Sequence, residues 1–541
     1  MNGYLNNIEN QLSNIHQLPA KKRLDLIINH PSPIKLLRSM PTADLLLTLR
    51  ELGAESSLEL VEMLHPRQVQ ELLDLEIWSQ DRLNARAAGF YFSLLFAANR
   101  DTAISQIHGL DIELIGLMFK LVTKIYDLTC NEEPEDYPDL YSLSPDGRFI
   151  VCFSEKEGDA GLAQSLHTLL LELYHRDMPF ALRLLESLRF ELASGLEEAS
   201  LRFRNSRLLD LGILPTDERL IYFSTVSPSE IRHALAQSPK PLGQPENTLP
   251  IKAVNQKIDE RYPYLLKALA QVSPERVERL WYEVNHAFVN MYASLSGDFG
   301  DREHMNQVGD YVKFLLDLGL LQHCQGQKEM AAESLNKASG KLLIRFGRTT
   351  LVNLRKRLIE KTKDINYIFG SDFCHGDLPL REVAQALSLA EPRFYEGLTD
   401  AKKLTVRYFL RLNDLNATIN AVNELIFRAE LVGKNGVGFT SDALKAHSHL
   451  SHASILARSL VNRFRGETDL LASISENVIK EIFSDQGRLK KEFVKTANSF
   501  MQAWSLTRLP QHNAQEIEEK NRHFLSSVLI QLEQNWRLVI G

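Results

Sequence analysis

Apolar residues recur every three or four positions along this chain, in short runs separated by glycine and proline. Between Thr42 and Gly53 the leucines fall on one face of a helix that Thr42 would cap and Gly53 would end. The next run stops at His65, because Pro66 disfavours helical geometry in the residue before it and suits the first turn of a following helix. Helices this short cannot each bury an apolar face alone, so we expect them to stack in succession.

Longer runs of the same spacing predict helices at about 84–98, 111–126, 159–177 and 179–208, and again throughout 263–541. One segment differs, because alternating residues on both sides of Ser144-Pro145-Asp146-Gly147 predict a β-hairpin near 140–154. The predicted fold class is therefore all-α, mainly helical, with one small β-hairpin insertion. The predicted domains are a helical superhelix at 20–126, a helical domain with the hairpin at 127–237, a proline-rich linker at 238–262 and a larger helical domain at 263–541.

Size and charge restrict the class of protein. A chain of 541 residues is too long for one ordinary core, and its formal net charge of -7 argues against a dedicated nucleic-acid binder. The N-terminus lacks the basic and apolar segments of a signal peptide, and no apolar run reaches the roughly 18 residues of a membrane span. The four cysteines lie far apart and form no CxxC pair. We therefore expect a cytoplasmic protein without a transmembrane segment.

Several segments resemble an uncharacterised bacterial family known only as a domain of unknown function. The segments that carry the resemblance are Leu75-Glu76-Ile77-Trp78-Ser79-Gln80-Asp81-Arg82-Leu83, the Ser144-Pro145-Asp146-Gly147 hairpin, Glu191-Leu192-Ala193-Ser194-Gly195-Leu196-Glu197-Glu198 with Arg202, Arg204, Arg207, Leu208, Asp210, Leu211 and Gly212, and Leu378-Pro379-Leu380-Arg381-Glu382-Val383 with Glu391-Pro392-Arg393-Phe394. Together they extend over most of the chain. The family carries no established activity, so the resemblance implies a fold and leaves the function open.

The first part of the chain, roughly 35–126, is also similar in pattern to the helical cytosolic N domain of MgtE-type magnesium transporters. That resemblance implies a superhelical stack of short helices. It also makes Mg²⁺ the first ion to consider for a sensing role, although no cofactor is predicted from the residues themselves.

Three arginines between Glu197 and Arg207 form the main candidate site. Arg204 and Arg207 are neighbours on a helix, and Glu198 and Arg202 have the spacing of an ion pair. A guanidinium binds carboxylate or phosphate with two parallel hydrogen bonds, so Arg202, Arg204 and Arg207 are candidates for binding an anion or a partner. The alternative is an internal lattice of salt bridges in which Glu191, Glu198 or Asp210 occupies these arginines.

Two segments resemble catalytic motifs, but their residues do not have the spacing that those motifs require. The string Cys374-His375-Gly376-Asp377 resembles the catalytic loop of aminoglycoside-type kinases, but Glu382 stands where that loop needs an asparagine for magnesium. The segment Gly433–Thr440 has its lysine far from the threonine, unlike a phosphate loop. We expect a helix cap and a connecting loop at these two places, and we predict no catalytic residue.

Two further groups could hold a metal ion. His449 and His452 would share a helical face while His447 points away, and no HExxH pattern is present. The acidic run from Glu132 to Asp139 lacks the spacing and the glycine of an EF-hand. A polar helix surface and a solvated loop are the simpler interpretations, and the sequence names no metal ligand.

The leading functional hypothesis is a non-enzymatic interaction or regulatory protein with a protein partner, because stacked helices present a broad surface for contact. A ligand-sensing or Mg²⁺-sensing module is the first alternative. An enzyme whose residues converge from distant segments is the second, since sites assemble in space. The sequence leaves the partner and the oligomeric state open.

Overall fold

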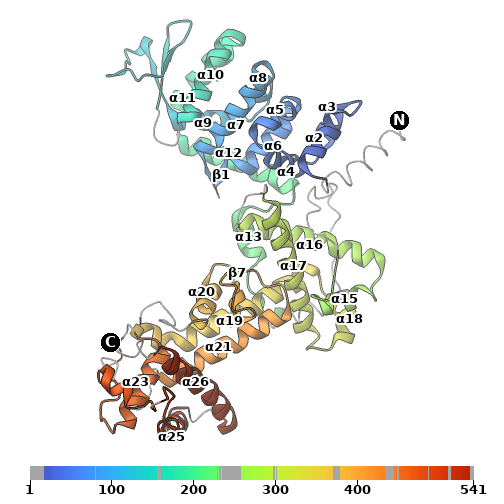
Figure 1. The fold of residues 1–541 in the computed structure, drawn as a ribbon. Coiled ribbons are helices and arrows are strands. Elements are labelled where there is room, and N and C mark those ends of the chain that lie inside the picture. The colour runs from blue at the N-terminus through green and yellow to red at the C-terminus, as the bar shows by residue number, and fades with distance from the viewer. Residues whose placement is uncertain are drawn as a thin grey trace.

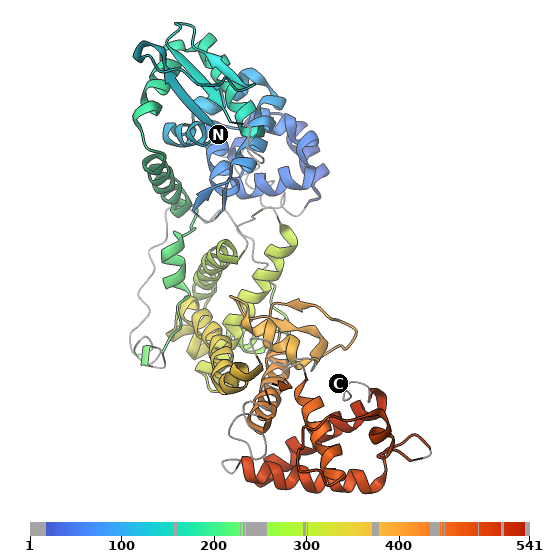
Figure 2. The same cartoon turned by 90° about the vertical axis from the view of Figure 1, so that its left-hand side faces the viewer.

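The computed structural model describes residues 18–535 apart from 80, 155–159, 228, 231–232, 234–256, 296–298, 300, 370–377, 433–443, 445, 448–449, 485 and 510–512. Within these residues the fold is mainly helical with a few short strands, as the apolar spacing predicts. The elements form an elongated molecule in which the chain proceeds from an upper lobe through a middle lobe to a lower one (Figures 1 and 2).

The upper lobe begins with a stack of short helices. These are α2 (Ala20–Ile28), α3 (Pro33–Ser39), α4 (Thr42–Leu52), α5 (Ala54–Met63), α6 (Pro66–Glu76), α7 (Ala85–Ala98), α8 (Arg100–His108) and α9 (Ile112–Val122). Gly53 ends α4 with a positive φ of 78°, and Pro66 begins α6, as predicted. The predicted cap at Thr42 is wrong, because Thr42 is the first helical residue and its hydroxyl donates to Glu71 instead.

A three-stranded antiparallel sheet follows, with strand order β3-β5-β4. Its strands are β3 (Thr123–Asp127), β4 (Tyr141–Leu143) and β5 (Phe149–Phe153). The predicted hairpin near 140–154 is the β4–β5 pair, with Leu143 opposite Ile150. The predicted helix at 111–126 is too long, because residues 123–127 form the strand β3. This strand pairs with all five residues of β5, which are buried. The single 3₁₀ turn η1 (Leu128–Cys130) follows β3 directly.

Three more helices complete the upper lobe: α10 (Ala160–Arg176), α11 (Met178–Phe190) and α12 (Ala193–Asp210). The single helix predicted at 179–208 is in fact two, because Glu191 and Leu192 take extended backbone angles between α11 and α12. Helix α10 packs against α7, and α12 packs against α9. Helices from the segments predicted as separate domains at 20–126 and 127–237 are thus in direct contact, while the division itself stays a prediction.

The middle lobe is built around two long helices that cross closely. Its helices are α13 (Thr216–Tyr222), α15 (Pro263–Leu269), α16 (Pro274–Leu295), α17 (Arg302–His323), η2 (Lys328–Met330), α18 (Ala331–Lys337) and α19 (Gly340–Phe369). A Cβ added at Gly319 of α17 would lie 2.0 Å from the carbonyl oxygen of Leu343, and one added at Gly347 of α19 would lie 2.0 Å from that of Leu315. Residue 319 of α17 lies opposite 343 of α19, and 315 lies opposite 347, so the two helices are antiparallel. Their backbones are in contact at Gly319 and Gly347 because glycine has no side chain. Most of the predicted linker, residues 238–256, lies outside the described residues.

The chain then forms α20 (Leu380–Ser388), β6 (Phe394–Tyr395), η3 (Glu396–Leu398), β7 (Val406–Arg407) and α21 (Leu412–Val432), followed in the lower lobe by α23 (His452–Phe464), α24 (Glu476–Lys480), α25 (Lys491–Arg508) and α26 (Ala514–Asn535). The strands β6 and β7 pair with each other, as do β1 (Trp78–Ser79) and β2 (Arg82–Leu83) near the start of the chain. One buried apolar core extends from Ile27 to Ile426 and a second from Phe427 to Leu532, so α21 contributes to both. Among the described helices, none combines the length and the apolar character needed to cross a membrane.

Candidate functional site

The arginines predicted from the sequence all lie on α12, at the base of the upper lobe (Figure 1). Leu196 and Leu208 bury one side of this helix, and Leu196 packs against Gly116 of α9. The structure therefore gives α12 an inner side, which faces α6 and α9, and an outer side in solvent. The three arginines divide between these two sides.

Arg207 binds two carboxylates on the inner side. Its Nε and Nη2 donate to Asp74 at 2.6 and 3.0 Å, and its Nη1 donates to Asp111 at 2.6 Å. Asp74 is 1% exposed and also accepts a hydrogen bond from Gln70. Burial alone would lower the pKa of Arg207, but the hydrogen bonds and charges of the two carboxylates outweigh it and raise that pKa. The guanidinium is thus held charged within the framework that joins α12 to α6 and α9.

Arg204 is also fixed on the inner side. Its Nε donates to the backbone carbonyl of Asp74 at 2.8 Å, and its guanidinium lies 5.3 Å from the centre of the Trp78 ring on β1. Burial lowers the pKa of Arg204 to about 10, against the opposing charges of Asp74 and Asp81. Arg204 therefore joins α12 to the β1–β2 hairpin.

Arg202 lies on the outer side and is exposed. The ion pair with Glu198 that its spacing indicated is not formed. The Arg202 guanidinium lies 5.2 Å from the centre of the neighbouring Phe203 ring, and in the described part of the chain it makes no hydrogen bond or ion pair. Glu191 instead accepts a hydrogen bond from Ser187. Of the three arginines, Arg202 is thus the one with an available guanidinium.

The outer side of α12 is a continuous exposed stripe. Glu198, Arg202, Ser206 and Leu209 follow at intervals of four, four and three residues and are all exposed. Just before the helix, Phe190 and Leu192 are each 75% exposed. This stripe and the two apolar residues before it, which we name the α12 outer face, can offer apolar area and one unneutralised cation to another molecule.

A second candidate lies beside the β6–β7 hairpin, and sequence reasoning missed it. A cavity of about 350 Å³ is lined by Glu396, Thr399, Asp400, Lys403, Arg407, Leu410, Arg411, Asn413 and Asp414. The signal that could have found it is the run of charged residues from Asp400 to Asp414 between two short apolar stretches.

Next to this hairpin, charged and aromatic side chains form a buried network. Glu391 accepts hydrogen bonds from the Tyr311 hydroxyl at 2.5 Å and from Arg348 Nε at 2.9 Å. The Tyr408 hydroxyl lies 3.1 Å from His304 Nε2 and accepts from Arg393 Nη2 at 2.8 Å. Burial, together with the charge of Glu391, raises the pKa of Tyr311, so its hydroxyl stays protonated. Because Tyr311 is fully buried and Glu391 is matched by Arg348, this network holds α17 and α19 against the segment 391–408.

The remaining sequence candidates give no assembled site. The segments Cys374–Asp377 and Gly433–Thr440 lie outside the described residues, as does His449. In the acidic loop, Glu132 accepts a hydrogen bond from Arg189 at 2.8 Å, so part of this run is tied to α11. Within the described ranges, no three His, Cys, Asp or Glu side chains gather as metal ligands would.

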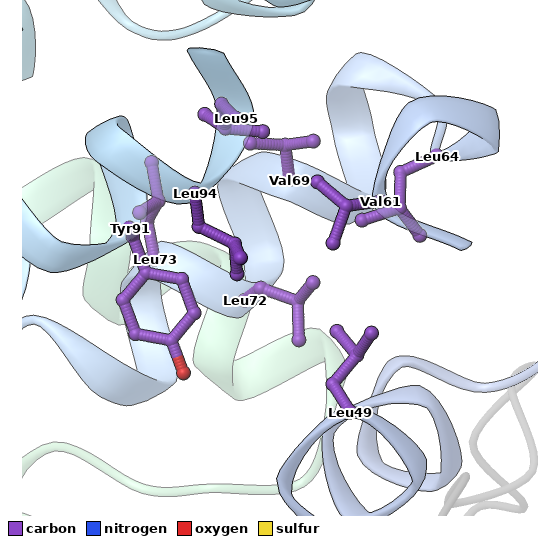
Figure 3. A pocket seen from close by; sticks show the side chains of 9 residues that line it. All are labelled: Leu49, Val61, Leu64, Val69, Leu72, Leu73, Tyr91, Leu94 and Leu95. Carbon is purple, nitrogen blue, oxygen red and sulfur yellow. The ribbon is translucent and has the colours of Figure 1, made fainter. Parts of the chain in front are cut away.

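A small apolar void lies inside the upper lobe (Figure 3). Its lining residues are Leu49, Val61, Leu64, Val69, Leu72, Leu73, Tyr91, Leu94 and Leu95. The Tyr91 hydroxyl donates to Glu76 at 2.7 Å. A volume of about 10 Å³ with apolar walls is too small for any organic ligand, so this is a packing defect of the core.

Comparison with known proteins identifies a family for this chain but no individual similar protein. Neither the curated proteins nor the solved structures contain a match to this sequence. A model described as a family of unknown function, DUF6178, matches residues 4–539, which is nearly the whole chain, and the protein therefore belongs to that family.

Proposed function

We propose that this protein is a non-enzymatic interaction or regulatory protein that docks a protein partner on the α12 outer face. The observation that carries the proposal is the contrast within one helix, where Arg204 and Arg207 are bound internally and Arg202 is left in solvent. Arginine is enriched at the energetic centres of protein interfaces because its planar group makes several hydrogen bonds at once.

Exposed apolar residues at the two ends of α12 support the same proposal. Phe190 and Leu192 are three-quarters exposed within one turn, and Leu209 is 44% exposed at the other end of the stripe. Single exposed apolar residues are ordinary on protein surfaces, but two of them at the start of the helix whose outer side carries Arg202 add apolar area to a surface with an exposed cation, and these are the two components of an interface. The partner that fits is a protein surface with an apolar contact and a carboxylate for Arg202.

Affinity capture from a native lysate with the full chain as bait tests this function. We expect the wild type to retain a partner in stoichiometric amount, and Arg202→Glu and Leu192→Asp each to lose it. The matched control is Arg357→Glu, a charge reversal at an exposed arginine of α19, which should retain the partner. Recovery of the free chain alone under mild conditions, or equal capture by Arg202→Glu and Arg357→Glu, would contradict the proposal.

A Mg²⁺-sensing role is a second candidate. It rests on the sequence pattern of residues 35–126 alone, since neither the matching family model nor any solved structure carries the resemblance to MgtE-type transporters. A ligand that binds the folded state must raise the melting temperature. Thermal unfolding with and without millimolar Mg²⁺ tests it, with Ca²⁺ as the control for a general divalent effect. An unchanged melting temperature in Mg²⁺ would remove this candidate.

A further inference from the structure

We propose that the cavity beside the β6–β7 hairpin binds a small zwitterion, a molecule that carries an amine together with a carboxylate or a phosphate. This site is separate from the α12 outer face and does not depend on the function proposed above. A volume of about 350 Å³ falls within the range of cavities that hold small organic molecules.

The floor of the cavity is already complete without a ligand. Arg407 donates from Nε to Glu396 at 3.1 Å and from Nη1 to Asp414 at 2.7 Å. Asp414 is buried and also accepts the backbone N–H of Leu410 at 3.0 Å. Arg407 thus pairs with both carboxylates, and the floor is a fixed polar base that carries one negative charge in excess.

Glu396 is held in its charged form. Its second carboxylate oxygen accepts the Thr405 hydroxyl at 2.7 Å. This hydrogen bond, followed by that of Arg407, outweighs partial burial and lowers the pKa of Glu396. Glu396 therefore stays ionised at neutral pH.

The rim carries groups that the floor does not satisfy. Lys403 is 59% exposed and forms a long ion pair with Glu396, whose carboxylate lies 3.9 Å from its Nζ, beyond hydrogen-bond distance, so its N–H groups stay available to a ligand. The side chain of Arg411 is exposed and makes no hydrogen bond or ion pair to any described residue. Asp400 is exposed on the same rim, where one of its oxygens accepts the backbone N–H of Lys402 at 3.1 Å.

The charge balance of the lining selects the class of ligand. Three cationic and three acidic side chains line the cavity, and their formal charges cancel. A ligand with a net charge would leave an uncompensated charge in the cavity, whereas a zwitterion would not. Lys403 and Arg411 would bind its carboxylate or phosphate through charge-assisted hydrogen bonds, and Asp400 would accept from its amine.

Thermal unfolding and calorimetric titration of the full chain test the proposal. The probes are a pool of neutral free amino acids, which offers carboxylates, and glycerophosphoethanolamine, whose phosphodiester carries a single negative charge beside its amine. We expect at least one of them to raise the melting temperature, and the one that does identifies the anionic group. No shift with either probe would overturn the proposal.

Matched probes and variants make the result specific. The same amino acids with acetylated amines should bind at least about tenfold more weakly, because a hydrogen bond to a charged group contributes roughly one to two decades of affinity. Lys403→Ala and Arg411→Ala should each weaken binding by a similar factor, while Lys402→Ala, an exposed neighbour outside the lining, should not. Equal binding of the acetylated pool, or affinity unchanged in Lys403→Ala and Arg411→Ala, would overturn the assignment.

Discussion

The base of the upper lobe and the cavity beside the β6–β7 hairpin use the same kinds of residue in opposite ways. At the base of the upper lobe, Arg207 is bound by Asp74 and Asp111, which come from two other helices. At the cavity, Arg407 is bound in a similar manner, but Lys403 and Arg411 stand around it at the rim with no carboxylate in hydrogen-bond contact. At the base of the upper lobe the charged side chains pair with one another and join helices. At the cavity some charged side chains remain available to bind a ligand.

This difference shows that a charged residue type does not decide between a structural and a binding role. What decides is whether a distant segment places an opposite charge against it in a water-poor environment. The following predictions test this distinction between buried, matched charges and exposed, unmatched ones.

Removal of the buried carboxylate should have the largest effect. Asp74→Ala removes the acceptor of Arg207 Nε and Nη2 and of Gln70 Nε2, so it should lower the free energy of unfolding by at least about 3 kcal/mol, measured by urea denaturation. Asp111→Ala is the control and should cost less, because Asp111 is partly exposed and Arg207 keeps Asp74. Equal costs for the two variants would show that burial does not separate these carboxylates.

A buried carboxylate without a cation provides the converse case. Asp317 is fully buried and accepts the backbone N–H groups of Tyr264 and Leu265, but no ion pair joins it to a described residue. Burial raises the pKa of Asp317 to about 7, above its value in the unfolded chain near 4. The folded state therefore binds a proton that the unfolded state releases, and this stability is present at low pH and lost as pH rises from about 4 to about 7.

Asp317→Asn should remove that dependence. The stability of the variant relative to the wild type should increase by about 2–3 kcal/mol between pH 5 and pH 8, measured by urea denaturation at each pH. Burial lowers the pKa of His286 to about 4, which gives an opposite trend between about 4 and 6.5, but this contribution is common to both proteins and cancels in the difference. A constant difference across this range would show that Asp317 is ionised in the folded protein.

Replacing Arg207 by lysine keeps the charge and removes the planar fork. One ammonium cannot reproduce the three short contacts to Asp74 and Asp111, so we expect Arg207→Lys to cost about 1–2 kcal/mol in urea denaturation. If lysine were tolerated at no cost, the charge alone would hold α12 in place.

The exposed cations should matter least for stability. Arg202→Ala and Lys403→Ala should each change the free energy of unfolding by less than about 0.5 kcal/mol, because neither side chain is buried or hydrogen-bonded in the described structure. Their effects should appear in partner capture for Arg202 and in ligand titration for Lys403. A loss of more than about 1 kcal/mol in the free energy of unfolding of either variant would show that its residue stabilises the fold, as Arg207 does.

Much of the helical architecture was predictable from the sequence, because local spacing and local breakers decide where helices form. Gly53 and Pro66 mark helix ends through their own backbone preferences, and Asp146-Gly147 marks the β4–β5 turn. The strand at 123–127 was missed because it exists only through pairing with residues 149–153. The break at Glu191–Leu192 was missed because apolar spacing continues through it.

The candidate arginines could be found from the sequence, but their roles could not. Helical spacing suggested Glu198 for Arg202 and nearby acids for Arg207, whereas the partners of Arg207 are 133 and 96 residues away. The charged residues of the cavity can likewise be read from the sequence. Which cation, Arg407 or Lys403, would be hydrogen-bonded to Glu396 and Asp414 depended on where the fold places these two carboxylates.

The sequence by itself determined the mainly helical class, helix ends such as those at Gly53 and Pro66, and the family, since these follow from residues close together in the chain. Tertiary structure alone decided which charges are matched, which remain in solvent and where a cavity forms. The physical reason is that ion pairing and burial depend on which side chains are close in space. Folding brings together side chains from segments that are far apart in the sequence, and no local pattern predicts which ones.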